Sequence, residues 1–353
     1  MVTPQPRPWQ QLSPQLSSRT KGRGHTGPFP KFLAKEFVMN VQKILSGAAG
    51  RTGGNQTMAA SAADFRTRLQ DWLPRVVLAP SFAMIVVFVY GFIAFSVVLS
   101  FTGSKMLPRF DFVGFDNYQR LFALQHWHIA VTNIAIFSTL YIVICTAVGL
   151  LLAILLDQKI RGEGLLRPIY LYPMALSFIV TGTAWKWFLD PGIGLQRVMQ
   201  QWGWESFSFT WIKDNDLALY CIVIAAVWQT SGFVMAMFLA GLRGIDNEIL
   251  KAAQIDGASN WQLYRRIVIP LLRPAFLSAF VILSHLAIKS YDLVIALTGG
   301  GPGRSTEMPA TFMYSYTFTR NQMGIGAASA VIMLMTIAAI MVPYLYAELK
   351  EKK

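Results

Sequence analysis

Five neighbouring residues inside a long apolar run could recognise a hydroxyl-rich ligand such as a sugar. They are Trp228, Gln229, Thr230, Ser231 and Phe233. An amide buried in hydrocarbon needs a hydrogen-bond partner, and an aromatic ring can stack on the C–H face of a sugar while the Gln229 amide binds its hydroxyls. The alternative is structural: Ser231 and Gly232 would permit close helix packing, and Gln229 would bond to a neighbouring helix.

A later apolar run contains three ionisable residues, His285, Lys289 and Asp292. Their spacing of i, i+4, i+7 places them on one face of a continuous helix. A charge at the centre of a membrane costs at least ~2.5–3.5 kcal/mol, so it normally faces a cavity or a partner. Either this face lines a polar pathway, or Lys289 and Asp292 form a structural ion pair with the lysine extended toward the membrane border.

No set of residues predicts catalysis. The glycine-rich stretch 299–305 lacks the lysine of a phosphate-binding loop, and no Ser-His-Asp arrangement is recognisable. His126 and His128 alternate at the edge of an apolar run, which suits a membrane border better than a metal site. Cys145 and Cys221 lie inside apolar runs and indicate neither a disulfide nor a zinc site. We therefore expect no enzyme, no cofactor and no metal.

The composition indicates a membrane protein. Of 353 residues, 54% are hydrophobic and 14% charged, against about 25% charged in ordinary globular domains. Six apolar segments each approach or exceed the ~20 residues that a membrane-spanning helix needs. They cover residues 76–101, 129–156, 168–187, 217–242, 274–297 and 323–347. The fold class that follows is an all-α membrane protein with six transmembrane helices.

The first 57 residues hold much of the net charge of +13. They are rich in Pro, Gly, Gln, Ser and Arg without an apolar period, so residues 1–73 are predicted to be a basic, disordered tail. The G-x-G-x-x-G pattern at 22–27 has no strand before it and is attributed to chance. Translation could begin at Met58 instead of Met1, where an ordinary membrane-protein N-terminus starts.

A polar, amphipathic island (residues 246–269, the elbow) separates the fourth and fifth apolar segments. Its first helix is predicted to begin with Asp246 or Asn247 as N-cap, to present Ile249, Ala252, Ala253 and Ile255 on one face, and to end at Gly257.

A second short helix should restart immediately after that glycine. Ser259 and Gln262 fit a capping box, and Pro270 and Pro274 are expected to end this helix. Without a partner, a helix–Gly–helix elbow would be a linker on the lipid headgroups.

The elbow resembles the coupling loop, or EAA loop, of ABC importer permeases. Lys251-Ala252-Ala253, then Asp256-Gly257-Ala258, then the apolar residues before Pro270, fall in register with the family pattern. The resemblance implies that the elbow docks in a groove of a cytoplasmic ATPase. Lys251 stands where the family usually has Glu, so that acidic contact is lost or moved to Glu248. The implied coupling residues are Glu248, Lys251, Ala252, Ala253, Asp256, Gly257, Ala258 and Arg265.

Further stretches resemble the carbohydrate branch of this family. FVGFDNY (112–118), DPGIG (190–194) and LTGGGP (297–302) match its signatures. WQTSGF (228–233), HLAIKSYDL (285–293) and PATFMYSYTF (309–318) are similar to glucose/mannose-type permeases. By resemblance to the maltose permease, the sugar would lie against Trp228, Gln229, Phe233, Ala287 and Ser290, unless the partner permease holds it.

The resemblance implies a permease subunit of a bacterial inner-membrane sugar importer. Its partners would be a second permease, two ATPase subunits and a periplasmic sugar-binding protein. Residues 74–128 would form the first span and an external loop, residues 129–347 the permease core, and residues 348–353 a cytoplasmic tail. The distribution of Lys and Arg places both termini and the elbow in the cytoplasm. Two alternatives remain open: an ion-coupled secondary transporter using Lys289 and Asp292, although 76–347 show no twofold repeat, and a scaffold subunit that transports nothing.

Overall fold

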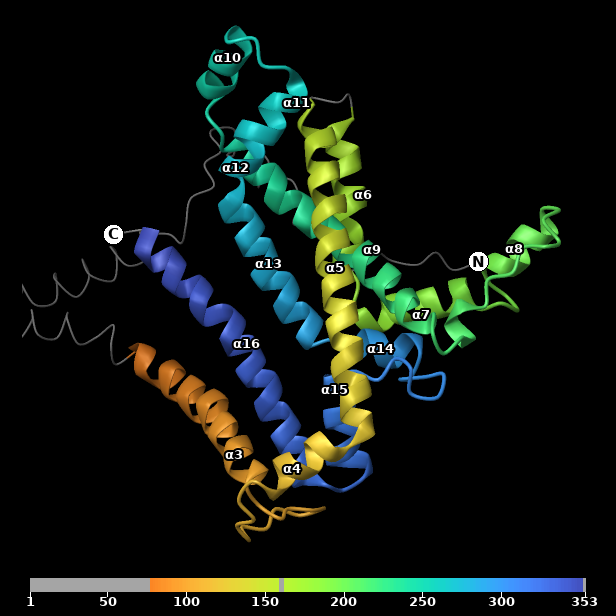
Figure 1. The fold of residues 1–353 in the computed structure, drawn as a ribbon, viewed down its shortest axis with the longest axis vertical. Coiled ribbons are helices and arrows are strands. Elements are labelled where there is room, and N and C mark those ends of the chain that lie inside the picture. The colour runs from red at the N-terminus through yellow and green to blue at the C-terminus, as the bar shows by residue number, and fades with distance from the viewer. Residues whose placement is uncertain (1–76, 159–161, 352–353) are drawn as a thin grey trace, which may run out of the picture. The chain divides into compact units, whose positions relative to one another are not determined.

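The computed structural model describes residues 77–158 and 162–351 (Figure 1). Within these ranges every regular element is a helix, apart from an isolated bridge between Thr102 and Phe112. Residues 81–353 form one compact unit. The predicted basic tail and the alternative start at Met58 lie outside the described residues.

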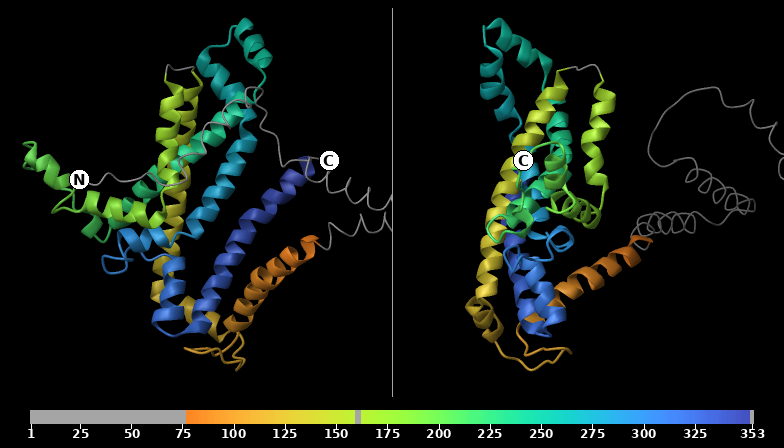
Figure 2. Two further views of the ribbon diagram at one scale, coloured as in Figure 1. Left: turned by 180° about the vertical axis from the view of Figure 1, so that it is seen from behind. Right: turned by 90° about the vertical axis from the view of Figure 1, so that its right-hand side faces the viewer.

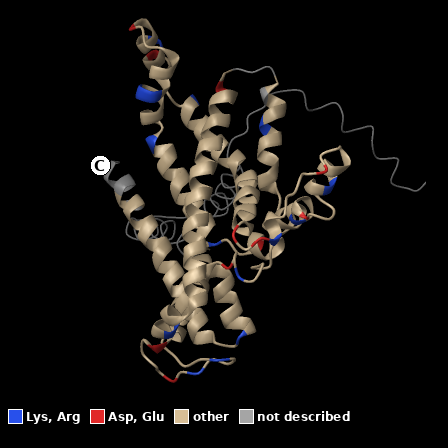
Figure 3. Cartoon of the chain, turned by 45° about the vertical axis from the view of Figure 1, so that its right-hand side comes forward, with Lys and Arg blue, Asp and Glu red and all other residues tan. Residues whose placement is uncertain are grey.

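Four helical stretches within the described residues are long and apolar enough to cross a membrane. They are Val77–Ser100, which includes η1 (Val86–Tyr90) and α3 (Gly91–Ser100), then Gln125–Asp157 (α5), Ala218–Arg243 (α9) and Met323–Tyr344, within α16 (Met323–Glu351). Two bent helix pairs raise this number to as many as six if each pair is one span. Figure 3 shows long uncharged stretches on these helices, with charged residues gathered at the elbow, in the loops and around the breaks.

The third apolar segment, predicted as a span over 168–187, is bent instead of being one straight helix. It consists of α6 (Glu163–Ala175) and α7 (Phe178–Leu189), whose axes differ by 99°. Leu176 and Ser177 adopt extended backbone conformations between them, three and four residues after Pro173. The Ser177 hydroxyl then accepts a hydrogen bond from the Val180 amide at 3.3 Å and starts the new helix. The local capping signal therefore overrides the continuity of the apolar run.

The elbow has the predicted helix–Gly–helix form. In α10 (Asn247–Ile255) the N-cap is Asp246, whose carboxylate accepts from the Glu248 amide at 2.9 Å. Gly257 has φ +82°, the left-handed conformation that glycine adopts without strain. Ser259 and Gln262 form both bonds of the capping box at the start of α11 (Asn260–Leu263).

The second helix of the elbow ends at Leu271, between Pro270 and Pro274, the two prolines that were expected to end it. It runs through η3 (Tyr264–Val268) and α12 (Ile269–Leu271), and then meets α13 (Arg273–Ile288) at a bend of 62°. In η3 the turn is widened, and the Ile269 amide bonds to the carbonyl of Tyr264 five residues back. Such a widened turn relieves the clash that proline causes inside a regular helix.

The fifth apolar segment also breaks. Helix α13 ends at Ile288, and α14 (Asp292–Leu297) begins after Lys289, Ser290 and Tyr291. The last turn tightens, because the Ser290 amide bonds to Ala287 only three residues back. His285, Lys289 and Asp292 therefore do not share one face of a continuous helix, and that prediction is wrong.

Helix α9 forms the centre of the bundle and is the most buried of the candidate spans. It packs along α5 and α6, while α7 lies against α14, and α3 against α16 (Figures 1 and 2). A Cβ atom on Gly232 would collide with the Tyr170 carbonyl of α6. This contact confirms the prediction that small residues at 231–232 permit close packing.

Shorter elements complete the end of the bundle opposite the elbow and the connection from α7 to α9 (Figure 1). They are α4 (Asp116–Ala123), α8 (Leu195–Gln201), η2 (Trp211–Lys213), α15 (Pro309–Tyr314) and η4 (Ser315–Thr319).

Candidate functional site

A cavity of about 460 Å³ lies where the bend between α6 and α7 faces α9. Its walls are mainly aromatic and apolar, and consist of Leu176, Thr181, Ala184, Trp185, Phe188 and Trp228. The Trp185 and Trp228 rings meet edge to face with centroids 5.8 Å apart. The 99° bend is what opens this space, because it turns α7 away from the line of α6.

Two buried oxygen atoms beside this cavity have no hydrogen-bond partner among the described residues. One is Thr181 Oγ1, on the cavity wall, and the other is Gln229 Oε1. Gln229 is only 3% exposed, and its Nε2 donates to the carbonyl of Leu176 at 2.9 Å. The amide thus supplies a partner for a carbonyl that the helix break leaves free. The structural alternative therefore holds for the Gln229 nitrogen, while its oxygen is buried and Gln229 does not line the cavity.

The remaining residues of the predicted group have separate roles. The buried hydroxyl of Thr230 accepts a hydrogen bond from Tyr141 of α5 at 2.9 Å, which fastens α5 to α9. Ser231 and Phe233 are half-buried, and Phe233 packs against the main core. Only Trp228 and Gln229 therefore belong to the neighbourhood of the cavity.

The ionisable group of the fifth segment is exposed on the isolated chain. His285, Lys289 and Asp292 are all exposed, whereas Ala287 is buried and Ser290 half-buried. Within the described part of the chain, no ion pair joins Lys289 to Asp292. The suggested structural pair is thus not formed. Charges in an apolar segment that lack an internal partner require water or a second chain around them.

The elbow presents most of its predicted coupling residues outward. Glu248, Lys251, Ala252, Asp256, Gly257 and Arg265 are exposed, Ala258 is half-buried and Ala253 is buried in the core. Of the apolar residues that the sequence predicted this helix to present, Ile249, Ala252 and Ile255 are exposed and Ala253 is buried.

Sequence reasoning named Ile255 among the residues that the elbow presents, but missed the exposed Trp261. Ile255 is 86% exposed and Trp261 is 72% exposed. Large apolar side chains that are this exposed on a polar elbow indicate a surface that a partner covers. Their presence in an otherwise polar stretch was the signal available in the sequence.

Two polar contacts fasten the elbow side of the bundle. Gln158 Nε2 donates to the Tyr264 hydroxyl at 2.9 Å, and Arg243 lies 3.9 Å from the Asp157 carboxylate. The first contact joins the end of α5 to η3 of the elbow. No local sequence pattern could have found it, because its members lie 106 positions apart.

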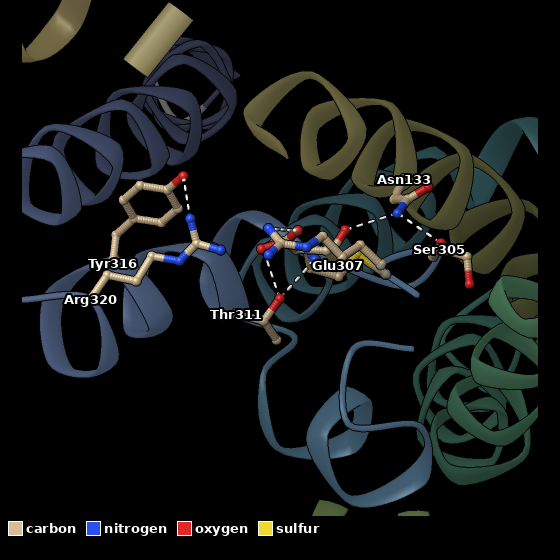
Figure 4. Close-up of polar contacts among 8 residues, drawn as sticks. Asn133, Ser305, Glu307, Thr311, Tyr316 and Arg320 are labelled. Atoms are coloured by element: carbon tan, nitrogen blue, oxygen red, sulfur yellow. Dashed lines mark hydrogen bonds and ion pairs between the residues drawn. The ribbon is translucent and has the colours of Figure 1, made fainter. Parts of the chain in front are cut away.

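A polar network holds the segment before α15 at the end opposite the elbow (Figure 4). Asn133 of α5 donates to the carbonyls of Ser305 and Glu307, both at 2.9 Å. The Glu307 side chain is buried with Arg304 Nη1 3.8 Å away. Burial raises the pKa of the Glu307 carboxyl above its ordinary value, while Arg304 and Arg320 act in the opposite direction. The network therefore contains a carboxyl that holds its proton more tightly than one in water.

Residues 145–351 match the family of binding-protein-dependent transport system inner membrane components. The chain belongs to this family. It is 41% identical over 278 residues to a probable ABC transporter permease protein of Pyrococcus horikoshii, covering 78% of this chain and 95% of that protein. A xylose/arabinose import permease protein of Haloferax volcanii is 32% identical, over 76% of this chain and 86% of its own length. A trehalose/maltose transport system permease protein of Thermococcus litoralis is 31% identical, over 68% of this chain and 80% of that protein.

Among solved structures, a bacterial ABC transporter that imports the acidic polysaccharide alginate has the same fold. The TM-score is 0.69 at 20% identity, with 82% of this chain and 99% of that chain covered. The permease is thus an all-helical, type I ABC importer subunit and an inner-membrane component. Members of this family are transport subunits rather than catalysts.

Proposed function

We propose that this permease forms one half of the translocation pathway of an ATP-driven sugar importer. A second permease would complete the pathway, a periplasmic binding protein would deliver the sugar, and two ATPases would bind the elbow from the cytoplasm, where both termini also lie. Support comes from the family, from relatives named for xylose/arabinose and trehalose/maltose, and from the exposed elbow.

The observation that carries the substrate assignment is the cavity beside the α6–α7 bend. Its aromatic walls suit the C–H face of a pyranose, and the Thr181 oxygen on its wall suits a hydroxyl. Among the residues that the structure describes, no charged side chain lines this cavity. We therefore assign a neutral saccharide, with a monosaccharide such as glucose or mannose as the specific proposal.

The exposed ionisable residues would line the same pathway where it meets the second permease. His285, Lys289, Ser290 and Asp292 provide donors and acceptors for a sugar that leaves the cavity, and Ala287 packs behind them. In this arrangement water and the second subunit solvate the charges, which removes the cost of placing them in lipid.

ATP hydrolysis would act on the pathway through the elbow. Closure of the ATPases moves α10 and α11, and the Gln158–Tyr264 contact passes this movement to α5. The pathway then shifts between two packed arrangements, one open to each side of the membrane.

The test is ATP hydrolysis by the complete importer in lipid nanodiscs, with its binding protein and a panel of sugars. We expect stimulation by glucose or mannose and none by the anionic glycerol 3-phosphate. Stimulation by a different neutral sugar would discard the monosaccharide proposal and keep the neutral class. Stimulation only by an anionic sugar would contradict the cavity assignment.

The exposed Lys289 and Asp292 favour one second candidate, an ion-coupled transporter. Proteoliposomes separate the two mechanisms. Sugar uptake driven by a sodium or proton gradient without ATP would support ion coupling, and strict dependence on internal ATP would exclude it. No uptake under either condition, with all subunits present, would support a scaffold role.

A further inference from the structure

The connection between α7 and α9, residues 190–217 (the aromatic loop), is held in shape by two half-buried glutamines. Gln196 Oε1 accepts from the Phe209 amide at 2.9 Å, and Gln200 Nε2 donates to the Phe207 carbonyl at 3.1 Å. The Trp204 amide also bonds to the Met199 carbonyl at 3.0 Å. Two glutamine side chains thus bond to backbone groups of the loop itself and fix its conformation.

The returning arm of the loop is fixed to the helix bundle. Phe209 and Ile212 pack against the main core, and the Phe209 ring stacks on Trp211 with centroids 5.0 Å apart. The conformation of the loop is therefore set by the bundle, and the exposure of its other aromatic residues is not a result of a loose segment.

The far edge of the loop presents two indoles outward. Trp202 is 77% exposed and Trp204 is 65% exposed. Polar residues of the same edge, including Gln201 and Ser206, are exposed beside the two indoles. Tryptophan, which joins a large apolar ring to one N–H donor, is the residue enriched where the membrane meets water.

The position of the loop identifies what covers these indoles. It begins at the end of α7 and returns to the start of α9, a helix apolar enough to cross a membrane, so the returning end of the loop lies at a border of the apolar layer. The border is the one opposite the elbow, because the other end of α9 leads into α10. Exposed Arg197, Glu205 and Lys213 add the charges of both signs that a zwitterionic headgroup layer accommodates. We propose that the aromatic loop is a lipid anchor, with Trp202 and Trp204 inserted at the phospholipid headgroup–acyl boundary.

This inference goes beyond the proposed transport function and requires only that the chain is embedded in a membrane. Its test uses the complete importer in phosphatidylcholine/phosphatidylglycerol nanodiscs, in a background where the buried Cys145 and Cys221 are replaced by Ala. A nitroxide is attached through Trp202→Cys or Trp204→Cys, and collisions with oxygen and with a water-soluble nickel chelate are measured. Lys213→Cys, on the same loop, is the matched control.

Labels at 202 and 204 are expected to collide more with oxygen than with nickel, and the label at 213 more with nickel. Preference for nickel at 202 and 204 would place them in water and overturn the proposal. Low collision with both reagents would mean that a protein subunit covers them, which also overturns it. Sugar-stimulated ATP hydrolysis is read separately, so failure of the anchor and failure of the transport assignment are distinguishable.

A second measurement retains both cysteines. In W202F/W204F the aromatic rings and the fold are kept but two indole emitters are removed. We expect the fraction of tryptophan fluorescence quenched by lipids brominated near the headgroup to fall relative to the unmodified importer. An unchanged or larger quenched fraction would contradict the insertion of these two indoles.

Discussion

At the scale of single residues, Trp228 and Gln229 are neighbours in sequence with different tasks. Trp228 is a wall of the cavity, whereas Gln229 closes the break between α6 and α7 through the Leu176 carbonyl. The sequence identified both as candidates for binding, because an amide and an indole in an apolar run indicate recognition as well as packing. Only the path of the third segment, which local sequence does not specify, separates these roles.

Trp228→Ala should raise the sugar concentration that gives half-maximal stimulation of ATP hydrolysis by roughly tenfold. An aromatic contact contributes about 1 kcal/mol beyond area burial, and the lost apolar contact adds to it. Trp228→Phe keeps a ring on the cavity wall and should lose less. Equal responses of the two variants would show that the ring does not contact the sugar.

Gln229→Leu should lower the stability of the permease by about 1–3 kcal/mol, because the Leu176 carbonyl is left buried without its donor. Thermal unfolding of the purified complex in nanodiscs measures this. Thr230→Val provides the comparison. Thr230 lies in α9 next to Gln229, and its replacement removes the acceptor of the Tyr141 hydroxyl of α5. An unchanged melting temperature of Gln229→Leu would mean that water can replace Gln229 as the hydrogen-bond donor to the Leu176 carbonyl.

At the scale of elements, the elbow is the part whose local structure was most predictable. Its caps are short-range hydrogen bonds, so Asp246, Ser259 and Gln262 specify them without help from the rest of the chain. The helix also ends between Pro270 and Pro274 as expected, but the widened turn η3 before Pro270 was not predicted.

Gly257→Asp should abolish transport while membrane insertion persists. The left-handed φ of +82° disfavours a side chain, and the new charge lies on the exposed surface of the elbow. Uptake and ATP hydrolysis in proteoliposomes measure the effect. Gly257→Asn is the matched control, because asparagine tolerates this conformation without adding charge. Normal uptake by Gly257→Asp would refute the coupling role.

The segment before α15 should lose stability as the pH rises. The raised pKa of Glu307 means that the folded protein binds more protons than the unfolded chain between the ordinary carboxyl value and the raised one. Its unfolding free energy therefore falls as the pH increases through that interval, and does not change beyond it. Glu307→Gln should flatten this dependence in thermal unfolding measured against pH. A wild-type curve that rises over the same interval would contradict the direction of the shift.

At the scale of the whole molecule, the isolated chain leaves ionisable side chains of an apolar segment exposed.

The sequence correctly predicted the helical class and most of the apolar segments, because length and hydropathy are summed over many residues. It did not predict the two breaks beside the candidate pathway. At Ser177 and at Lys289–Tyr291, a few local backbone hydrogen bonds outweigh the apolar period of the surrounding run.

A cysteine at position 289 should report whether the assembled importer hydrates this region. Lys289→Cys, in a background with Cys145 and Cys221 replaced, is expected to react with a water-soluble thiol reagent in the complete importer, and more slowly when sugar is bound. The Ala287→Cys variant, at a buried position in the same segment, should remain unreactive. If the cysteine at position 289 did not react in any state of the transport cycle, residue 289 would lie in a protein contact from which water is excluded.

The close contact of Gly232 with the Tyr170 carbonyl has a consequence for how such a permease could diversify. One turn earlier on the same helix, Trp228 borders a cavity with room for other side chains, whereas position 232 admits none. Substitutions at 228 could therefore change the preferred ligand while the packing of α6 on α9 is inherited intact. Selection for a new ligand would act on residue 228, whose replacement does not disturb the packing of α6 on α9. Ligand preference and helix packing can therefore evolve separately.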